Sequence, residues 1–302
     1  MSNVSKRKFL KSAGLCTILA ATGNIHDGLS FLSPISNKND LPQLFASEPF
    51  ETFFTENNRT KVLCIEVGDF EFSIGNAFLK KSILAHYHND HNFNFIPITH
   101  SNQYYYLNEL LAHAHAVFFV GSIYNRDFWV MRDLILTYNI ALLCTVIPSN
   151  NDNTKNNQFK PAKNEAYIPI SKKNFVFSAI KIIQNLSCLI LVQGRVGLDF
   201  ADIKSALVRS NCVATHIDGS LTNIVDNLKV HLLDCKRMML GSKRILYNIL
   251  SSSKVELHLN LLTEIVEGFS SIIPEGWYDC QWGIVESINI NTDIEITILF
   301  ET

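Results

Sequence analysis

The chain has 302 residues, of which 47% are hydrophobic and 18% are charged, and its formal net charge is −2. This composition is typical of a folded globular protein with a large core, and it excludes a disordered chain. The near-neutral charge gives no electrostatic basis for a nucleic-acid partner, so we predict none.

Residues 1–59 are predicted to be a basic tail and linker, because Asn, Ser, Asp and Pro are frequent and periodicity is poor. The run Ser-Lys-Arg-Lys-Phe-Leu-Lys at residues 5–11 is similar to a twin-arginine export signal, with Lys6 in the first arginine position. The same composition also suits a segment that lies on anionic lipid. The apolar stretch at 12–22 is too short to span a membrane, so export and peripheral membrane contact both stay open.

Between residues 60 and 173, continuous apolar runs alternate with segments of helical periodicity. Uninterrupted apolar runs predict strands that are buried on both faces, and their alternation with helices predicts a parallel sheet covered on both sides. We therefore predict an α/β fold, with strands at 61–67, 93–97, 116–120 and 140–147 and helices at 74–84, 107–114 and 128–138. Pro148 should stop the last of these strands, and residues 149–165 are polar and predict a loop.

A long apolar helix is predicted at 174–194, with Asn174 as its N-cap. It is apolar almost all round, so it should be buried on most sides. Its polar residues argue against a membrane span: Lys181, Gln184 and Asn185. Residues 195–302 predict a smaller α+β domain, with helices ending at 209 and spanning 221–237 and 257–272, and strands at 212–216, 244–250, 279–286 and 294–300.

The seven cysteines are odd in number and widely spaced, and no two of them form a Cys-x-x-Cys pair. Most lie in apolar runs, which favours buried free thiols in a reducing compartment. This supports a cytoplasmic location, against the export signal. They are Cys16, Cys64, Cys144, Cys188, Cys212, Cys235 and Cys280.

The most distinctive motif is Arg-Val-Gly-Leu-Asp-Phe-Ala-Asp at residues 195–202, directly after the long helix. Its acids, Asp199 and Asp202, open the next helix, where negative charge stabilises the positive helix end without any other purpose. The motif also resembles the loop Asn-x-Asp-Phe-Ala-Asp of the tubulin/FtsZ family, with Gly197 in place of the Asn. In that family both acids reach the nucleotide of the next subunit, so the resemblance implies that they orient the water that attacks GTP.

The order of elements resembles FtsZ over residues 60–302, most clearly from 174 onwards. The resemblance implies a GTP-binding-type domain at 60–173, a central helix at 174–194 and an FtsZ-like C-terminal domain at 195–302. GTP is the cofactor that it implies, and GTPase activity is the reaction.

Both glycine-rich GTP-binding loops of that family are altered in this chain. Residues 69–72 carry Asp, Phe, Glu and Phe where the first loop has glycines, and the second loop keeps one glycine. Backbone N–H groups need glycine to approach a phosphate closely, and the added carboxylates would repel it. We therefore predict weak or lost GTP binding and an impaired or inactive GTPase. The residues left to contact GTP are Gly68, Gly75, Asn76, Ala77 and Gly121.

A second motif, His-Tyr-His-Asn-Asp-His at residues 86–91, supports a different function. It resembles the zinc-binding signature of metallo-β-lactamase-fold hydrolases, in which such residues hold two zinc ions and polarise water. Asn and Phe follow where that fold has a glycine pair, and the later ligands are not in suitable places. A zinc-dependent hydrolase that uses His86, His88, Asp90 and His91 is therefore the alternative interpretation.

The principal interpretation is a divergent FtsZ/tubulin-like cytoskeletal protein. Its partner would be a second copy or an authentic FtsZ, joined through head-to-tail contacts of the filament type, in cell division. Because the acids persist while the phosphate loops do not, the chain would stimulate hydrolysis in a neighbour or cap a filament. We expect it in the cytoplasm or at the membrane, with lipid contact through its N-terminal segment.

Overall fold

In the computed structural model, the residues from Thr60 to Thr302 form one compact unit. The described residues are 60–67, 93–98, 104–149, 159–192, 194–239, 242, 244–272, 279–287 and 290–301. The unit is built on a nine-stranded sheet with the order β2-β1-β3-β4-β5-β6-β9-β7-β8.

The first half of the sheet is parallel throughout. It contains β1 (Val62–Val67), β2 (Phe93–Ile98), β3 (Ala116–Gly121), β4 (Leu142–Ser149) and β5 (Glu165–Ser171). Every residue of β1 and β3 is buried, as expected of strands that are covered on both faces.

The second half of the sheet is mixed. Strand β6 (Ser210–Gly219) pairs in parallel with β5 over two residues and then antiparallel with β9 (Ile294–Glu301). Strand β7 (Arg244–Ser252) lies antiparallel to β9 and parallel to β8 (Asp279–Ser287). Strand β6 therefore joins the two halves into one sheet.

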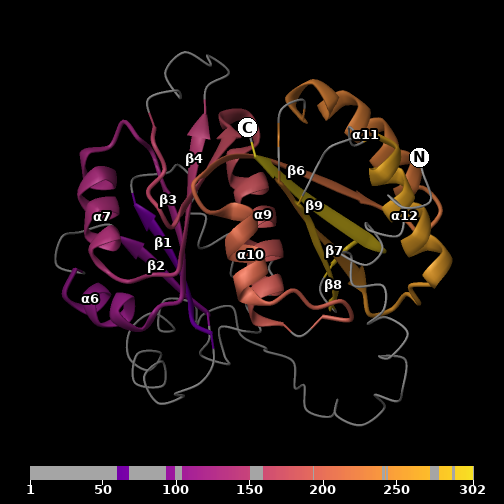
Figure 1. The fold of residues 1–302 in the computed structure, drawn as a ribbon. Coiled ribbons are helices and arrows are strands. Elements are labelled where there is room, and N and C mark those ends of the chain that lie inside the picture. The colour runs from indigo at the N-terminus through magenta and orange to yellow at the C-terminus, as the bar shows by residue number, and fades with distance from the viewer. Residues whose placement is uncertain are drawn as a thin grey trace, which may run out of the picture. The chain divides into compact units, whose positions relative to one another are not determined.

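Helix α9 (Phe175–Leu191) lies against one face of the sheet, with α10 (Phe200–Leu207) directly after it in the chain (Figure 1). Its buried side chains share a single core with residues of both halves, including Phe118, Ile168, Leu246 and Leu299. Because α9 serves both halves, most of its surface is apolar and buried. A stretch that includes it, Lys172–Leu191, is long and apolar enough to cross a membrane, but its position here is that of a core helix.

The remaining helices lie at the two sides of the unit in Figure 1. On the first half are α6 (Tyr104–His113) and α7 (Arg126–Thr137), and on the second half are α11 (Ile224–Met239) and α12 (Leu259–Ile272). Phe128 of α7 stacks on Phe119, and Phe269 of α12 stacks on Tyr247. Since Phe119 and Tyr247 alternate with residues that face α9, α7 and α12 cover the opposite face.

The predicted α/β class is confirmed, with a parallel sheet, a long central helix and a second part of mixed strands. Strand β5 was not predicted: Pro169 interrupts its apolar run, and proline usually marks an edge or a break in a strand. Pro148 lies within β4 and does not stop it. The helix predicted at 74–84 falls outside the described residues.

The prediction that Asn174 caps α9 is wrong. Its side chain makes no capping hydrogen bond, because a turn of 3₁₀ helix (Lys172–Asn174) leads directly from β5 into α9. The prediction of free thiols is confirmed for the described cysteines, of which Cys280 alone is half-buried and the others are buried. Burial raises the pKa of the Cys188 thiol to about 12 and that of Cys212 to about 11, so these thiols stay protonated.

Candidate functional site

The predicted acids Asp199 and Asp202 lie together at the N-terminal end of α10. Asp199 is the N-cap: its Oδ1 accepts a hydrogen bond of 2.7 Å from the backbone N–H of Asp202. Asp199 is exposed, and Asp202 is half-exposed in the first turn. We call this pair and the turn that carries it the Asp199–Asp202 face.

The loop that leads from α9 to this face is anchored to β8. Val196 forms an antiparallel bridge with Ile284, whose N–H donates to the Val196 carbonyl at 3.0 Å. Gly194 is required beside this bridge, because a Cβ there would clash with the Ile284 carbonyl oxygen. Arg195 also forms an exposed ion pair with Glu286.

Gly197 lies in the same loop under different constraints. A Cβ at this position would meet nothing within 4 Å, and the backbone does not require glycine. The glycine that replaces the Asn of the tubulin/FtsZ pattern is therefore not imposed by packing.

The C-terminal end of α10 is held by Arg244, the first residue of β7. Its guanidinium donates to both carboxylate oxygens of Glu301, at 3.1 and 2.9 Å. It also donates to the carbonyl oxygens of Ser205 at 2.6 Å and Val208 at 3.2 Å. Carbonyls in the last turn of a helix have no intrahelical donor, so Arg244 satisfies groups that would otherwise need water.

The turn after α10 is also fixed from the first half of the sheet. Arg209 adopts a positive φ of 60°, and its N–H donates to the Glu165 carbonyl at 2.8 Å. Positive φ is uncommon for residues other than glycine, so the surrounding contacts must hold the turn in place.

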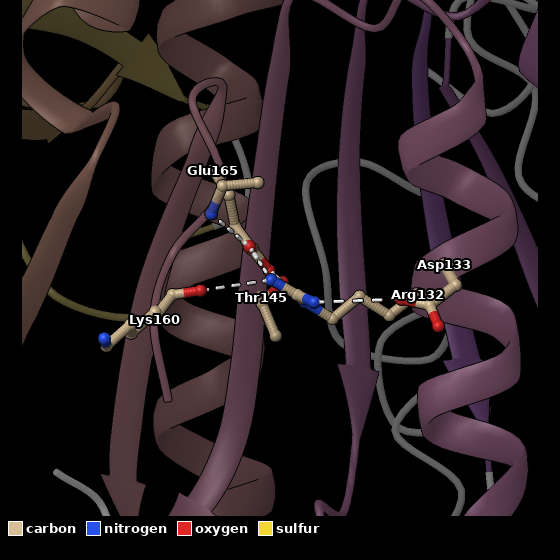
Figure 2. A network of polar contacts seen from close by, with 6 residues as sticks. Arg132, Asp133, Thr145, Lys160 and Glu165 are labelled. Carbon is tan, nitrogen blue, oxygen red and sulfur yellow. Dashed lines mark hydrogen bonds and ion pairs between the residues drawn. The ribbon is translucent and has the colours of Figure 1, made fainter. Parts of the chain in front are cut away.

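The Glu165 side chain is itself fully buried in a network that Figure 2 shows. Arg132 of α7 donates to both of its carboxylate oxygens, at 2.9 and 2.5 Å. Thr145 donates at 2.5 Å, and the N–H of Ala162 donates at 2.8 Å. Arg132 also reaches the Lys160 carbonyl and lies over the Phe159 ring. A buried carboxylate with this many donors is satisfied, which indicates a structural role.

The other predicted site lies at the carboxyl ends of the parallel strands, where Gly121 ends β3 beside Val67 of β1. A Cβ on Gly121 would lie 2.6 Å from the Phe128 ring and 3.3 Å from the Val67 carbonyl oxygen. Packing against Phe128 is therefore sufficient to explain this glycine.

The segment after Gly121 forms a closed turn before α7. The N–H of Asn125 donates to the Ser122 carbonyl at 2.9 Å, and the N–H of Asp127 donates to the Asn125 side chain at 2.9 Å. The N–H of Tyr124 lies 3.4 Å from the Ser122 hydroxyl. These amides therefore have acceptors inside the turn. The Asp127 carboxylate occupies the first turn of α7, where the helix favours negative charge.

The two predicted sites lie at opposite ends of α9. Gly121 and Ser149 are at the carboxyl edge of the parallel strands. Strand β5 ends at the same edge, and α9 begins there after the 3₁₀ turn. The Asp199–Asp202 face follows the other end of α9. Helix α9 has 17 residues, so it is about 26 Å long. One molecule cannot bring both sites to the same ligand.

Along its length, α9 is fixed to the second half of the sheet by polar contacts. Lys181 donates to Glu295 at 2.6 Å, and the Asn248 amide donates to the Asn185 carbonyl at 3.1 Å. His216 lies beside them, with Nδ1 at 3.0 Å from the Thr297 hydroxyl and Nε2 at 3.8 Å from Glu295. Burial, together with Lys181, lowers the pKa of His216 to about 3, so it is neutral at pH 7.

The other predicted site residues fall outside the described residues. They are Gly68, Gly75, Asn76 and Ala77 of the first glycine loop, and His86, His88, Asp90 and His91 of the zinc alternative. Within the described ranges, no group of three or more His, Cys, Asp or Glu side chains could hold a metal ion.

Sequence analysis did not identify Arg244, Arg132 or Glu165. Arg244 contacts carbonyls 36 and 39 residues away, and Arg132 contacts a carboxylate 33 residues away. Contacts to distant backbone oxygens leave no local pattern in a single sequence. The one signal available in the sequence was a charged residue, Arg244, at the start of a mostly apolar strand.

Comparisons with known proteins give one kind of match. No family model and no curated protein matches this chain. Among solved structures, the chain is similar to one described as "Crystal structure of GDP-form protofilaments of Bacillus thuringiensis serovar israelensis TubZ". The identity is 12%, the match covers 89% of each chain, and the TM-score is 0.46.

Proposed function

We propose that this chain is a divergent tubulin/FtsZ-like cytoskeletal protein that acts by head-to-tail contact with itself or with an authentic FtsZ. The observation that carries the proposal is the placement of the Asp199–Asp202 face after the far end of α9, a helix about 26 Å long that begins at the carboxyl ends of the parallel strands. Acids at that distance serve a nucleotide only if it belongs to a second molecule.

The same proposal includes weak or lost binding of GTP by the chain itself. The closed turn after Gly121 supports this, because three of its amides have acceptors inside the turn and Asp127 already adds negative charge to the first turn of α7. A chain of this kind completes a neighbour's site without having a working site of its own. It either stimulates GTP hydrolysis in the neighbour or caps the filament end, which gives it a role in cell division.

The test is the rate of GTP hydrolysis by an authentic FtsZ with increasing amounts of the full chain. Asp199→Asn preserves a capping oxygen and removes the charge, and Asp202→Asn removes the second charge. We expect each substitution to reduce the change in rate at least tenfold. Asp226→Asn is the matched control, since Asp226 is an exposed acid in the first turn of α11. Equal activity in all variants would refute the role of the two acids.

Cytoplasmic location with peripheral membrane contact through residues 5–22 is a separate part of the proposal. Four cations, Lys6, Arg7, Lys8 and Lys11, precede an apolar stretch there. Sedimentation with anionic vesicles should recover the chain, and replacement of these cations by Glu should abolish recovery. Cleavage within this segment on export would instead identify a twin-arginine signal.

A further inference from the structure

Helix α10 is short, and hydrogen bonds from both halves of the sheet hold its C-terminal turn. It has eight residues, so it is about 12 Å long, and its N-terminal end carries the exposed Asp199–Asp202 face. Its C-terminal turn is held by Arg244 from the second half of the sheet and by the Glu165 carbonyl from the first half. A tilt of roughly 10° about the held end would displace the acids by about 2 Å.

The hydrogen bonds from Arg244 to Glu301, Ser205 and Val208 fix the direction of α10 in a way that other side chains cannot reproduce. The planar guanidinium binds Glu301 with two nitrogens and still has donors for the Ser205 and Val208 carbonyls. Lysine offers one nitrogen, so it cannot reach both the carboxylate and the helix end with the same geometry. The Ser205 carbonyl depends on this contact, because the N–H of Arg209 donates to Glu165 instead.

We propose that Arg244 is the positioning residue for the Asp199–Asp202 face. It sets the direction in which α10 presents the two acids to a neighbouring molecule. This inference rests on the proposed function for its consequence, while the positioning of α10 can be measured without any partner.

The experiment compares Arg244→Lys, Arg244→Met and the milder Glu301→Gln in the full chain. Hydrogen exchange of the free chain reports on α10 directly. We expect the amides of residues 203–207 to exchange at least tenfold faster in both Arg244 variants, while those in the middle of β7 and β9 keep their protection. Arg126→Met is the matched control, because Arg126 is an exposed arginine at the start of α7.

The partner assay then tests the consequence for the acids. With FtsZ, the maximal rate of stimulated GTP hydrolysis should fall at least tenfold in Arg244→Lys, while the concentration for half-maximal co-assembly changes less than threefold. A general folding defect would instead expose β7 and β9 to exchange as well.

Unchanged exchange in α10 for both Arg244 variants would overturn the inference. Loss of α10 protection with full retention of stimulated hydrolysis would also overturn it. If the unsubstituted chain has no effect on FtsZ, the proposed function fails, and exchange still decides whether Arg244 positions α10. Should the Arg244 variants fail to fold, Glu301→Gln gives the same readout, because it keeps Arg244 and the shape of residue 301 and removes only the negative charge.

Discussion

The two ends of α9 are built for different purposes. At the carboxyl ends of the strands, Gly121 packs on Phe128 and the following turn uses its own amides. At the other end, Asp199 and Asp202 remain exposed or half-exposed, on a helix that contacts from both sheet halves hold in place. The first end is organised by internal packing and the second presents charge outward. We infer from this difference that any retained activity is directed at a second molecule.

The largest expected effect on stability comes from the buried contact between Arg132 and Glu165, whose carbonyl also binds the turn after α10. Arg132→Met leaves the fully buried Glu165 carboxylate without its cation, which should lower the free energy of unfolding by about 3–5 kcal/mol. Denaturant unfolding measures this. The control is Asp133→Asn, because Asp133 is exposed and 4.0 Å from Arg132, and it should change stability by less than about 0.5 kcal/mol. Equal losses of stability in Arg132→Met and Asp133→Asn would mean that the buried network does not stabilise the fold.

A second effect concerns His216 of β6, which lies beside the contact between Lys181 of α9 and Glu295. The pKa of His216 is about 3 in the folded chain, against the ordinary histidine value of 6.5 in the unfolded chain, so the unfolded chain binds more protons as the pH falls. This contribution to stability is therefore almost complete well above pH 6.5, and stability should decline by roughly 2 kcal/mol between pH 6.5 and 4.5.

His216→Gln should reduce that slope. It should not remove it, because burial also lowers the pKa of His231. Unfolding measured at several pH values decides the matter, and an identical slope in the variant would show that His216 does not titrate as its burial requires.

A third effect separates packing from phosphate binding at Gly121. Gly121→Ala places a methyl group 2.6 Å from the Phe128 ring, so it should lower stability by about 1–3 kcal/mol. Phe128→Leu makes room, and in the double variant the two costs should be less than additive. Calorimetry of the four proteins measures the coupling. Strict additivity would contradict the packing explanation.

A fourth effect concerns the structural role of Asp199. Asp199→Ala removes the N-cap of α10 and should cost about 1 kcal/mol, whereas Asp199→Asn should cost almost nothing. If the acid serves a neighbour, both variants lose that activity despite their different stabilities. If activity falls only in Asp199→Ala, the variant that loses stability, then Asp199 acts only as a helix cap.

The smallest expected effect on stability is at Gly197. Gly197→Asn meets no atom within 4 Å, so the melting temperature should stay within about 2 °C. The substitution restores the residue of the tubulin/FtsZ pattern, and we expect it to increase the stimulation of hydrolysis in FtsZ. A decrease would show that the loop has diverged beyond that pattern.

Most of the fold could be predicted from apolar runs, because buried parallel strands such as β1 and β3 are uninterrupted. Strand β5 could not be predicted, because Glu165 and Pro169 interrupt its apolar pattern. The acids of the candidate site were found because Asp199 and Asp202 sit three residues apart at a helix start. Arg244 was missed because its contacts to α10 are to backbone oxygens, which every residue carries, and its carboxylate partner Glu301 lies 57 residues away.

The central claim is that the two ends of α9 differ in function. The most direct measurement is a GTP titration of the full chain by calorimetry, run beside light scattering with and without an authentic FtsZ. We predict no binding at micromolar GTP, together with altered FtsZ assembly. Micromolar GTP binding with self-assembly of the chain alone would contradict the claim, because the closed turn after Gly121 would then belong to a working nucleotide site.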